Sequence, residues 1–562
     1  MTHIELPETF NLADYFLFDR EREGLGGKTA VRWGERSWSY AHVADRSRAL
    51  ARWFVDRKMV PGERVYIVLP DTPAFAWSIF GTLAAGGVVT MGNPVAPPDD
   101  LLYVLDYVRA TALVTTPAVA AALAPRLGEL PQLRDIVLSP DAPTGAEVEV
   151  LIDPPAELAP VGPRVTSLHA AIVQGRELTA ALPVIKRDDH AIWLFTSGST
   201  GRAKAAMHSH RDFAFNTEVY AKRTVGYRTD DITVSVPRLF FGYATGTNLW
   251  FPFAVGATVG LFSERPTAES VAAAIARYRP TVVTNVPTML GKLLDLDDER
   301  RAAAAPGLDL SSVRFHLSAG EALPEPLLRR FIERFGGEVY DGIGSAEMFH
   351  IYCSNRPGDV VAGSLGRVVE GYTLAILPEE AEDPGCAQVS PGEIGVLWVK
   401  GDSVAHGYFL DREKSWKTFH GHWCRTGDLF RIDERGYLWF SGRADDLFKV
   451  GGIFVAPREV EDCLLAHPAI SQAAVIPGDD GGLTKPKALV VVRPDARGRI
   501  ETAIAKRALS DELKRHVQHR LSKHKYPRWV LFVDELPKND RGKVDKKLLI
   551  ERESRGELGG EP

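Results

Sequence analysis

A run of small, hydroxylated and charged residues has the composition of a phosphate-binding loop. It reads Phe195-Thr-Ser-Gly-Ser-Thr-Gly-Arg-Ala-Lys204. Glycine lets the backbone approach an oxyanion closely, free amides and hydroxyls donate hydrogen bonds to phosphate oxygens, and lysine adds a positive charge. The spacing differs from that of the common P-loop, G-x-x-x-x-G-K-[ST]. A simple surface turn is the alternative interpretation.

Several polar segments follow this loop along the chain. They are Asp341-Gly-Ile-Gly-Ser-Ala-Glu347, Arg425-Thr-Gly-Asp428, Gly442-Arg-Ala-Asp-Asp446 and Pro537-Lys-Asn-Asp-Arg-Gly-Lys543. Together with the loop, and in this order, they resemble the signature motifs of the adenylate-forming superfamily, which includes acyl-CoA synthetases, peptide-synthetase adenylation domains and luciferases. The sequence departs from that pattern at Ala203 and Ala205, which replace a proline and a glycine, and at Ala346, which replaces a threonine.

The resemblance implies an ATP site built from these motifs. The phosphates would be held by Thr196, Ser197, Gly198, Ser199, Thr200, Gly201 and Lys204. The adenosine would be held by Gly320, Glu321, Ala322, Asp341, Gly342, Ile343, Asp428 and Arg443. Asp428 would accept hydrogen bonds from both ribose hydroxyls, because a carboxylate offers acceptor sites on both oxygens. A turn capped by Asp428 before Phe430 is the alternative.

The resemblance also implies two catalytic residues, Glu347 and Lys543. Glu347 would hold Mg²⁺ on the ATP phosphates, because a hard cation takes oxygen ligands and keeps several waters. Lys543 would place its charge against the substrate carboxylate and the α-phosphate during adenylation. Asp445 falls at the family's hinge, about which the C-terminal domain rotates to remove Lys543 and bring in a thiol tunnel. The resemblance assigns this tunnel to Lys449, Gly451 and Gly452.

The C-terminal region is basic. Residues 506–555 contain 15 Lys or Arg against 8 Asp or Glu. Such a surface would receive the phosphates of coenzyme A, or it is a solvated helix face. Lys538, Lys546 and Lys547 are expected on solvated faces.

Three further segments, residues 239–243, 317–324 and 341–351, are similar to those of benzoate-CoA ligases and other aryl-CoA ligases. This likeness implies a pocket lined by Phe241, Gly242, Tyr243, Ser318, Ala319, Gly320, Ile343, His350 and Ile351. Aromatic and small residues make a flat slot for a planar ring, and His350 or Tyr243 would meet a hydroxyl or amine on that ring. A core histidine is the alternative for His350. Gly242 suggests room for a substituent, so anthranilate or a hydroxybenzoate rivals benzoate.

The elements that must position these residues alternate between helix and strand. Helix-like residues 49–54 precede strand-like residues 65–69, and residues 275–278 precede 281–285. This alternation predicts an α/β fold with mostly parallel sheets flanked by helices. Residues 363–399 predict short strands in a β-rich subdomain, and helices are expected at residues 457–465 and 508–521. A charged break at residues 442–446 predicts a large N-terminal adenylation domain, residues 1–444, and a small mobile α+β C-terminal domain, residues 445–562, that carries the catalytic lysine.

Composition limits the other possibilities. The chain of 562 residues is 45% hydrophobic and 25% charged, which excludes a largely disordered protein. Its net charge of -6 gives no sign of nucleic-acid binding. The four cysteines lack zinc-site spacing. With no secretory signal and no apolar run of about 18 residues, we expect a cytoplasmic monomer or homodimer without a membrane partner.

The resemblance implies an AMP-forming acid-thiol ligase. ATP and an aromatic carboxylate would give an acyl adenylate and pyrophosphate, and the thiol of coenzyme A would then take the acyl group. A stand-alone adenylation enzyme that loads an acyl-carrier or aryl-carrier protein is the main alternative. A non-catalytic ligand-binding relic, suggested by Ala346, and a P-loop hydrolase are more distant ones.

Overall fold

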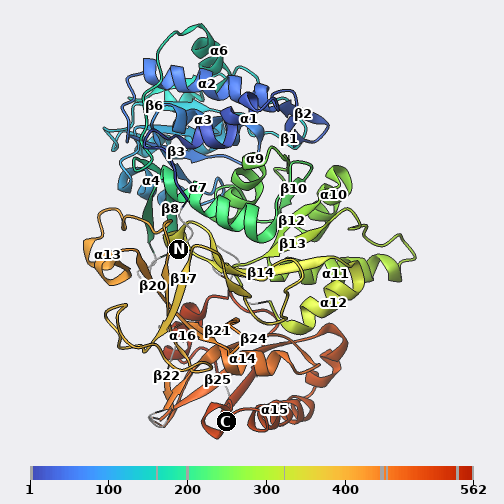
Figure 1. The fold of residues 1–562 in the computed structure, drawn as a ribbon. Helices are drawn as coiled ribbons and strands as arrows, with labels where there is room; N and C mark the ends of the chain where they lie inside the picture. The colour runs from blue at the N-terminus through green and yellow to red at the C-terminus, as the bar shows by residue number, and fades with distance from the viewer. Residues whose placement is uncertain are drawn as a thin grey trace. The chain divides into compact units, whose positions relative to one another are not determined.

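The computed structural model describes residues 4–159, 162–197, 202–321, 323–443, 448–450, 453–481, 483–538 and 544–559 (Figure 1). At residues 197, 443, 449, 453 and 454 it describes the backbone. The chain divides into two compact units. The first contains Met1–Leu374 and Val399–Arg425, and the second contains Ala375–Trp398 and Thr426–Pro562. The boundary expected between residues 444 and 445 stays a prediction, because residues 444–447 are outside the described part.

The first unit contains a seven-stranded sheet that ends in the strands flanking the phosphate loop. Its order is β7-β6-β5-β3-β4-β8-β9, and neighbours are parallel except for β8 and β9. The strands are β3 Arg64–Val68, β4 Val88–Met91, β5 Ala112–Thr115, β6 Asp135–Leu138, β7 Arg164–Ser167, β8 His190–Ser197 and β9 Ala203–Ser209. Its helices are α2 Tyr40–Asp56, α3 Pro73–Ala84, α4 Pro98–Tyr107, α5 Pro117–Leu127 and α6 Leu168–Glu177. Parallel neighbours require such crossover helices.

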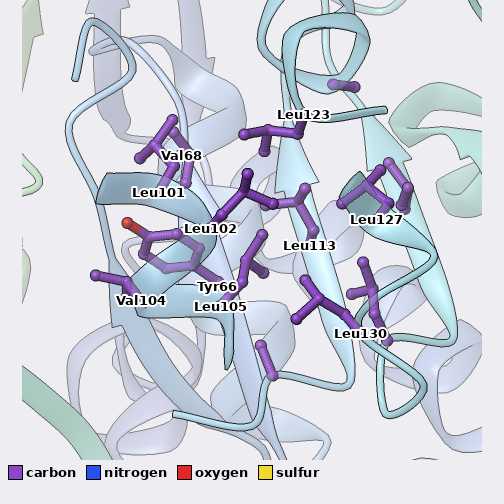
Figure 2. Close-up of a cluster of buried hydrophobic side chains, with 14 of the residues drawn as sticks. Tyr66, Val68, Leu101, Leu102, Val104, Leu105, Leu113, Leu123, Leu127 and Leu130 are labelled. Atoms are coloured by element: carbon purple, nitrogen blue, oxygen red, sulfur yellow. The ribbon is translucent and has the colours of Figure 1, made fainter. Parts of the chain in front are cut away.

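Helices α4 and α5 cover one face of this sheet. Helix α4 begins with Pro98, followed by Asp99 and Asp100, residues that suit the first turn of a helix. Its leucines meet those of α5 and the strand residue Leu113 in one buried cluster (Figure 2). Burial of such side chains is the main favourable contribution to the stability of the sheet.

Residues 75–91 are buried throughout. Every residue of α3 is buried, as expected for a helix that is apolar on all sides, and β4 follows directly. Among the described residues, no helix has both the length and the apolar character that crossing a membrane requires.

A second, nine-stranded sheet completes the first unit. Its order is β16-β15-β14-β13-β12-β10-β11-β1-β2, with parallel neighbours from β14 to β1. The strands are β1 Thr29–Trp33, β2 Arg36–Ser39, β10 Ile232–Ser235, β11 Thr258–Leu261, β12 Val282–Asn285, β13 Phe315–Ser318, β14 Glu338–Gly344, β15 Ile351–Ser354 and β16 Arg367–Val368. Its α-helices are α1 Asp19–Arg22, α7 His210–Asn216, α8 Gly242–Thr245, α9 Phe251–Ala254, α10 Ala268–Tyr278, α11 Pro287–Ala302 and α12 Glu325–Phe335. Shorter or wider turns of helix are η1 Asp14–Phe18, η2 Ala156–Leu158, η3 Thr217–Val225, η4 Gly246–Trp250 and η5 Ala346–Met348.

A smaller sheet contains the points where the chain passes from one unit to the other. It holds β17 Thr373–Leu377, β18 Gly395–Lys400, β19 Phe419–His420, β20 Trp423–Ile432 and β21 Leu438–Arg443. The unit boundaries fall within β17, β18 and β20. Helix α13 Arg412–Thr418 precedes β19. The short strands predicted for residues 363–399 are therefore confirmed.

The rest of the second unit is the predicted α+β domain. The hairpin β22 Phe448–Val450 and β23 Ile453–Val455 precedes a sheet of β24 Ile470–Asp480, β25 Leu483–Val492 and β26 Trp529–Phe532. Its helices are α14 Pro457–Leu465, α15 Ala503–Gln518 and α16 Lys546–Ser554, with η7 Pro494–Ile500 and η8 Lys523–Lys525. Leu464, Val490 and Leu513 lie in its core.

Candidate active site

Strands β8 and β9 hold the two ends of the phosphate loop together. Thr196 pairs with Lys204 and Ser197 pairs with Ala203 across the two antiparallel strands. Ala205 likewise pairs with Phe195. The two alanines that depart from the family motif therefore stand in regular strand, where a proline would lack the amide that pairing uses.

Lys204 follows this loop in β9, and its side chain contacts Asp411 and Tyr408. Its Nζ lies 3.2 Å from Oδ2 of Asp411 and 5.9 Å from the ring centroid of Tyr408. The segment of residues 405–409 reaches Lys204 because it pairs with β9, through hydrogen bonds from the Met207 amide to the Gly407 carbonyl (3.0 Å) and from the Phe409 amide to the Ala205 carbonyl (3.0 Å). No sequence motif indicated Tyr408 or Asp411.

Glu347 lies in the turn η5 and is held by two direct contacts and by a third contact on the preceding residue. The Tyr408 hydroxyl donates to Glu347 Oε1 (2.7 Å), and the Ala405 amide donates to the Glu347 carbonyl (2.8 Å). His208 Nε2 lies 2.6 Å from the Ala346 carbonyl, and its Nδ1 lies 2.9 Å from Oδ2 of Asp212. Lys204 and Glu347 are therefore brought together around Tyr408. Burial, reinforced by Glu347, raises the pKa of Tyr408, so its hydroxyl stays a donor.

The surroundings of Glu347 fit a hard cation bound to phosphates. Its carboxylate is half-buried, and among the described residues Oε2 has no hydrogen-bond partner. The Ser345 hydroxyl is buried and also lacks a partner within the described part of the chain. One carboxylate oxygen and one hydroxyl suit a cation that keeps several of its waters. Ser345 is also the residue that could replace the threonine missing at position 346.

A predicted aryl-pocket residue, Ser318, and a predicted adenosine contact, Asp341, lie on two neighbouring parallel strands. Ser318 of β13 is in register with Asp341 of β14, and both are buried. Burial raises the pKa of Asp341 to about 8, an effect that the nearby Ser318 hydroxyl partly offsets. A Cβ at Gly342 would lie 2.8 Å from the Cys353 carbonyl, so only glycine fits there. Glu321, a predicted adenosine contact that follows β13, accepts a hydrogen bond from the hydroxyl of Thr288 (2.7 Å). No motif in the sequence indicated Thr288.

The predicted aryl pocket gathers around His350. Its Nε2 donates to the Tyr243 carbonyl (3.0 Å), and its ring centroid lies 5.4 Å from that of Tyr243 and 4.7 Å from that of Phe251. A Cβ at Gly246 would lie 2.4 Å from the imidazole, so only glycine leaves room for the ring at this position. No motif in the sequence indicated Gly246. Burial lowers the pKa of His350 to about 4, and Nδ1 is buried without a partner among the described residues.

The remaining pocket residues lie on the same elements. Ile343 lies in β14, one residue before its end and in register with Cys353 of β15, and Ile351 and Ala319 are buried. Gly242 begins α8 after Phe241, and a Cβ there would lie 3.2 Å from Leu194, which belongs to β8. Glycine at position 242 thus permits close packing against Leu194. Because β8 continues to Thr196, the predicted aryl-pocket residues lie close to a group that we call the phosphate cluster, made of Lys204, Glu347, Tyr408 and Asp411.

The turn between Glu347 and His350 connects the predicted phosphate site with the predicted aryl pocket. Phe349 between them has a φ of 67°, in the left-handed region that is uncommon for a bulky residue. Its ring lies 3.9 Å from that of Phe213, which fixes the turn in this conformation. Strained backbone of this kind often accompanies functional sites.

The second unit holds the other predicted adenosine contacts. Asp428 lies inside β20, in register with Arg443 of β21, so the alternative of a capped turn is wrong. The Asp428 amide donates to the hydroxyl of Thr426 (3.2 Å). Lys449 lies in β22 opposite Phe454.

Several predicted site residues lie outside the described residues. They are Gly198, Ser199, Thr200, Gly201, Ala322, Asp445, Gly451, Gly452 and Lys543. The expectation that Lys546 lies on a solvated face is wrong. Its Nζ lies 2.7 Å from Oε1 of Glu461, whose side chain is buried.

Comparison with known proteins agrees with these motifs. The AMP-binding enzyme family model matches residues 18–409, and the model of the AMP-binding enzyme C-terminal domain matches residues 459–543. The benzoate-CoA ligase of Thauera aromatica is 36% identical over 97% of this chain and 97% of its own length.

Two solved structures have the same fold. An anthranilate CoA ligase in complex with anthranoyl-AMP superposes with a TM-score of 0.83 at 32% identity, covering 97% of this chain and 98% of that one. A benzoate CoA ligase from Burkholderia xenovorans LB400 gives 0.79 at 35%, covering 96% and 99%. The predicted α/β fold is thereby confirmed, and the chain belongs to the AMP-binding enzyme family, the adenylate-forming superfamily that its motifs resemble.

Proposed function

We propose that this chain is an ATP-dependent aryl-CoA ligase. The observation that supports the proposal is the joint placement of Lys204 and Glu347 around Tyr408, in the same unit where His350 contacts Tyr243, two residues that we propose line an aryl pocket. Phosphate chemistry next to an aromatic pocket suits the activation of an aromatic acid. Relatives that act on benzoate and anthranilate support the same substrate class.

In the first half-reaction a carboxylate oxygen of the acid attacks the α-phosphorus of ATP. The bond from that phosphorus to the bridging oxygen breaks, and pyrophosphate leaves. Lys204 positions the β- and γ-phosphates, and Glu347 and Ser345 are the residues that would hold Mg²⁺. The ion supplies positive charge that offsets the phosphate charge. Lys543 supplies a second cation at the α-phosphate.

In the second half-reaction the sulfur of coenzyme A attacks the acyl carbon. The bond to the AMP oxygen breaks, AMP leaves, and the thiol proton is released to solvent. Activation is needed because the free carboxylate is a poor electrophile. Lys449, Gly451 and Gly452 form the proposed thiol path, where glycines leave room for a narrow pantetheine arm.

The test is a substrate screen by ATP–pyrophosphate exchange across benzoate, anthranilate, hydroxybenzoates, cinnamates and short fatty acids. Aromatic acids should give the fastest exchange, and added coenzyme A should yield the thioester and AMP. Fastest exchange with a fatty acid would refute the aryl pocket. Exchange without any thioester would show that the acceptor is not free coenzyme A.

A further inference from the structure

Tyr408 joins the two charged groups of the phosphate cluster, although no motif marks it. Its side chain is 7% exposed, its hydroxyl donates to Glu347 Oε1 (2.7 Å), and its ring lies 5.9 Å from Lys204 Nζ. The residue therefore contacts the proposed metal ligand through its polar end and the proposed phosphate ligand through its ring. A role in catalysis itself is not required by these contacts.

The position of the hydroxyl is fixed by the contacts of the segment that carries it. Tyr408 forms a β-bridge with Ala206 of β9, and its amide donates to the hydroxyl of Ser415 (2.8 Å). Its ring packs against Phe419 at a centroid distance of 5.2 Å. A buried ring with a pinned backbone has little rotational freedom, so its hydroxyl is held at one point relative to β9.

Glu347 is correspondingly restricted. Its carbonyl is bound by Ala405 and the preceding carbonyl by His208, so its backbone cannot move independently of the side-chain contact. With Oε1 bonded to Tyr408, the carboxylate is turned so that Oε2 is the oxygen left for a ligand. A carboxylate already held in one rotamer loses less entropy when it binds a cation.

We propose that Tyr408 is a positioning residue that orients Glu347 for the cation of a bound metal–nucleotide complex. The inference rests on the proposed function, since it takes Glu347 as the metal ligand. Tyr408 therefore strengthens nucleotide binding only when the metal is present.

The experiment compares a non-hydrolysable ATP analogue with and without Mg²⁺ by calorimetry, in the full-length chain. Tyr408→Phe removes the hydroxyl and keeps the ring. Losing one hydrogen bond to a charged group should reduce the tightening of analogue binding by Mg²⁺ about tenfold. Binding of the metal-free analogue should stay unchanged.

Two further variants separate positioning from packing. Tyr278→Phe removes another buried hydroxyl, which donates to the Leu261 carbonyl (2.6 Å), and should keep the full Mg²⁺ effect. In a Glu347→Ala background, Tyr408→Phe should add nothing, because Tyr408 acts only through Glu347.

Three outcomes would overturn the proposal. Tyr408→Phe could keep the wild-type Mg²⁺ effect, or it could weaken binding equally with and without metal, which would indicate packing alone. If Glu347→Ala itself leaves the Mg²⁺ effect intact, Glu347 is not the metal ligand and the proposal falls with that assignment. Thioester formation from an aromatic acid would still test the remainder of the proposed function.

Discussion

Lys204 and Asp411 form an ion pair that the phosphates of ATP would have to replace. Asp411 is also the N-cap of α13, where it accepts from the Lys414 amide (3.1 Å), so asparagine can keep the cap while it removes the charge. The side chains of Lys204 and Asp411 are 13% and 31% exposed, which limits the strength of the pair. We expect Asp411→Asn to lower the KM for ATP up to about fivefold. A higher KM measured by pyrophosphate exchange would mean that Asp411 holds Lys204 in its working position.

His350 has a defined hydrogen-bonding character. Its pKa of about 4 keeps the ring neutral at physiological pH, and because Nε2 donates to the Tyr243 carbonyl, Nδ1 is an acceptor. In the proposed aryl pocket, a hydroxyl or amine on the substrate ring would donate a hydrogen bond to Nδ1. We expect His350→Leu to reduce the kcat/KM of hydroxybenzoates or anthranilate relative to benzoate by about tenfold, whereas His350→Asn, which keeps an acceptor, should retain most of the preference.

Pyrophosphate exchange with matched acid pairs measures this ratio. Equal losses for benzoate and its substituted forms in both variants would assign His350 to packing alone.

At this scale the sequence indicated the residues that stand in motifs but not those that support them. Lys204, Glu347 and His350 are recognisable because their neighbours along the chain are unusual. Tyr408 and Gly246 act through contacts with residues far away in sequence. A glycine before Tyr408 and an aspartate three residues after it were the available signals, and neither differs from an ordinary turn.

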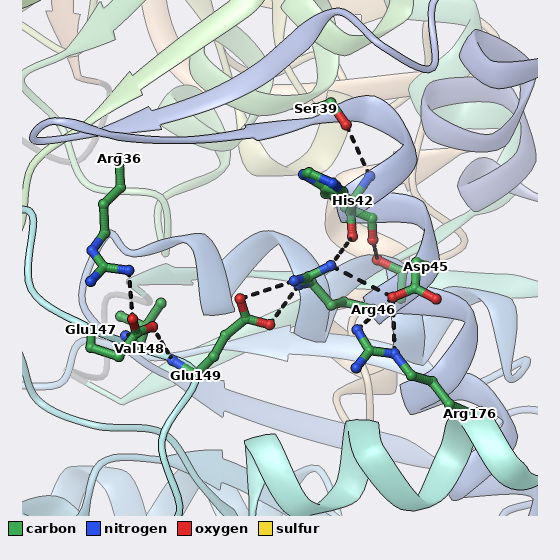
Figure 3. A network of polar contacts seen from close by, with 11 residues as sticks. Arg36, Ser39, His42, Asp45, Arg46, Glu147, Val148, Glu149 and Arg176 are labelled. Atoms are coloured by element: carbon green, nitrogen blue, oxygen red, sulfur yellow. Dashed lines mark hydrogen bonds and ion pairs between the residues drawn. The ribbon is translucent and has the colours of Figure 1, made fainter.

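Among the elements, helices α2 and α6 are in close backbone contact at Gly175. A Cβ at Gly175 of α6 would lie 1.9 Å from the Ala49 carbonyl of α2. Charged contacts surround this crossing: Arg176 donates to Asp45 (2.6 Å), and Arg46 donates to Glu149 (2.7 Å) (Figure 3). Gly175 sets the distance between the two helices. The ion pairs at the edge of the crossing contribute less to the free energy of unfolding.

Gly175→Ala should therefore force the two helices apart. We expect a loss of about 2–3 kcal/mol in the free energy of unfolding, measured by urea denaturation. Arg176→Ala, which removes a rim ion pair from the neighbouring position, should cost under about 1 kcal/mol. A similar loss in both variants would contradict this division between backbone packing and surface charge.

Elements with strong local signals were predicted well. The helix expected at residues 457–465 is confirmed as α14. The helix expected at 508–521 is observed as α15 Ala503–Gln518, which begins earlier because Thr502 caps it by accepting from the Ala505 amide (3.1 Å). The pairing of β9 with residues 405–409 had no local signal, because the paired residues lie far apart in the sequence.

For the whole molecule, buried histidines predict loss of stability in acid. Burial lowers the pKa of His210 and His316 to about 3 and that of His350 to about 4. The unfolded chain binds these protons near pH 6.5, so stability should fall as the pH drops from about 6.5 towards 4. Asp341 acts in the opposite direction, because its folded pKa of about 8 favours the folded state increasingly as the pH falls from 8 towards 4.

The melting temperature between pH 4.5 and 7 checks this balance. Asp341→Asn removes the opposing contribution, so its stability should fall more steeply with decreasing pH than that of the wild type. Parallel curves for the two proteins would show that Asp341 is not protonated in the folded chain at neutral pH.

The division of the chain has a consequence for biosynthesis. The first unit takes residues 399–425 from beyond a segment that belongs to the second unit, and those residues include Tyr408 and Asp411. The amino-terminal portion emerging from a ribosome cannot complete its phosphate cluster until residue 411 has been made, well after both large sheets have all their strands. A fragment ending at Leu374 should therefore form the two large sheets but lack the contacts of Tyr408 and Asp411 with Lys204 and Glu347. The chain would become able to bind nucleotide only late in its synthesis.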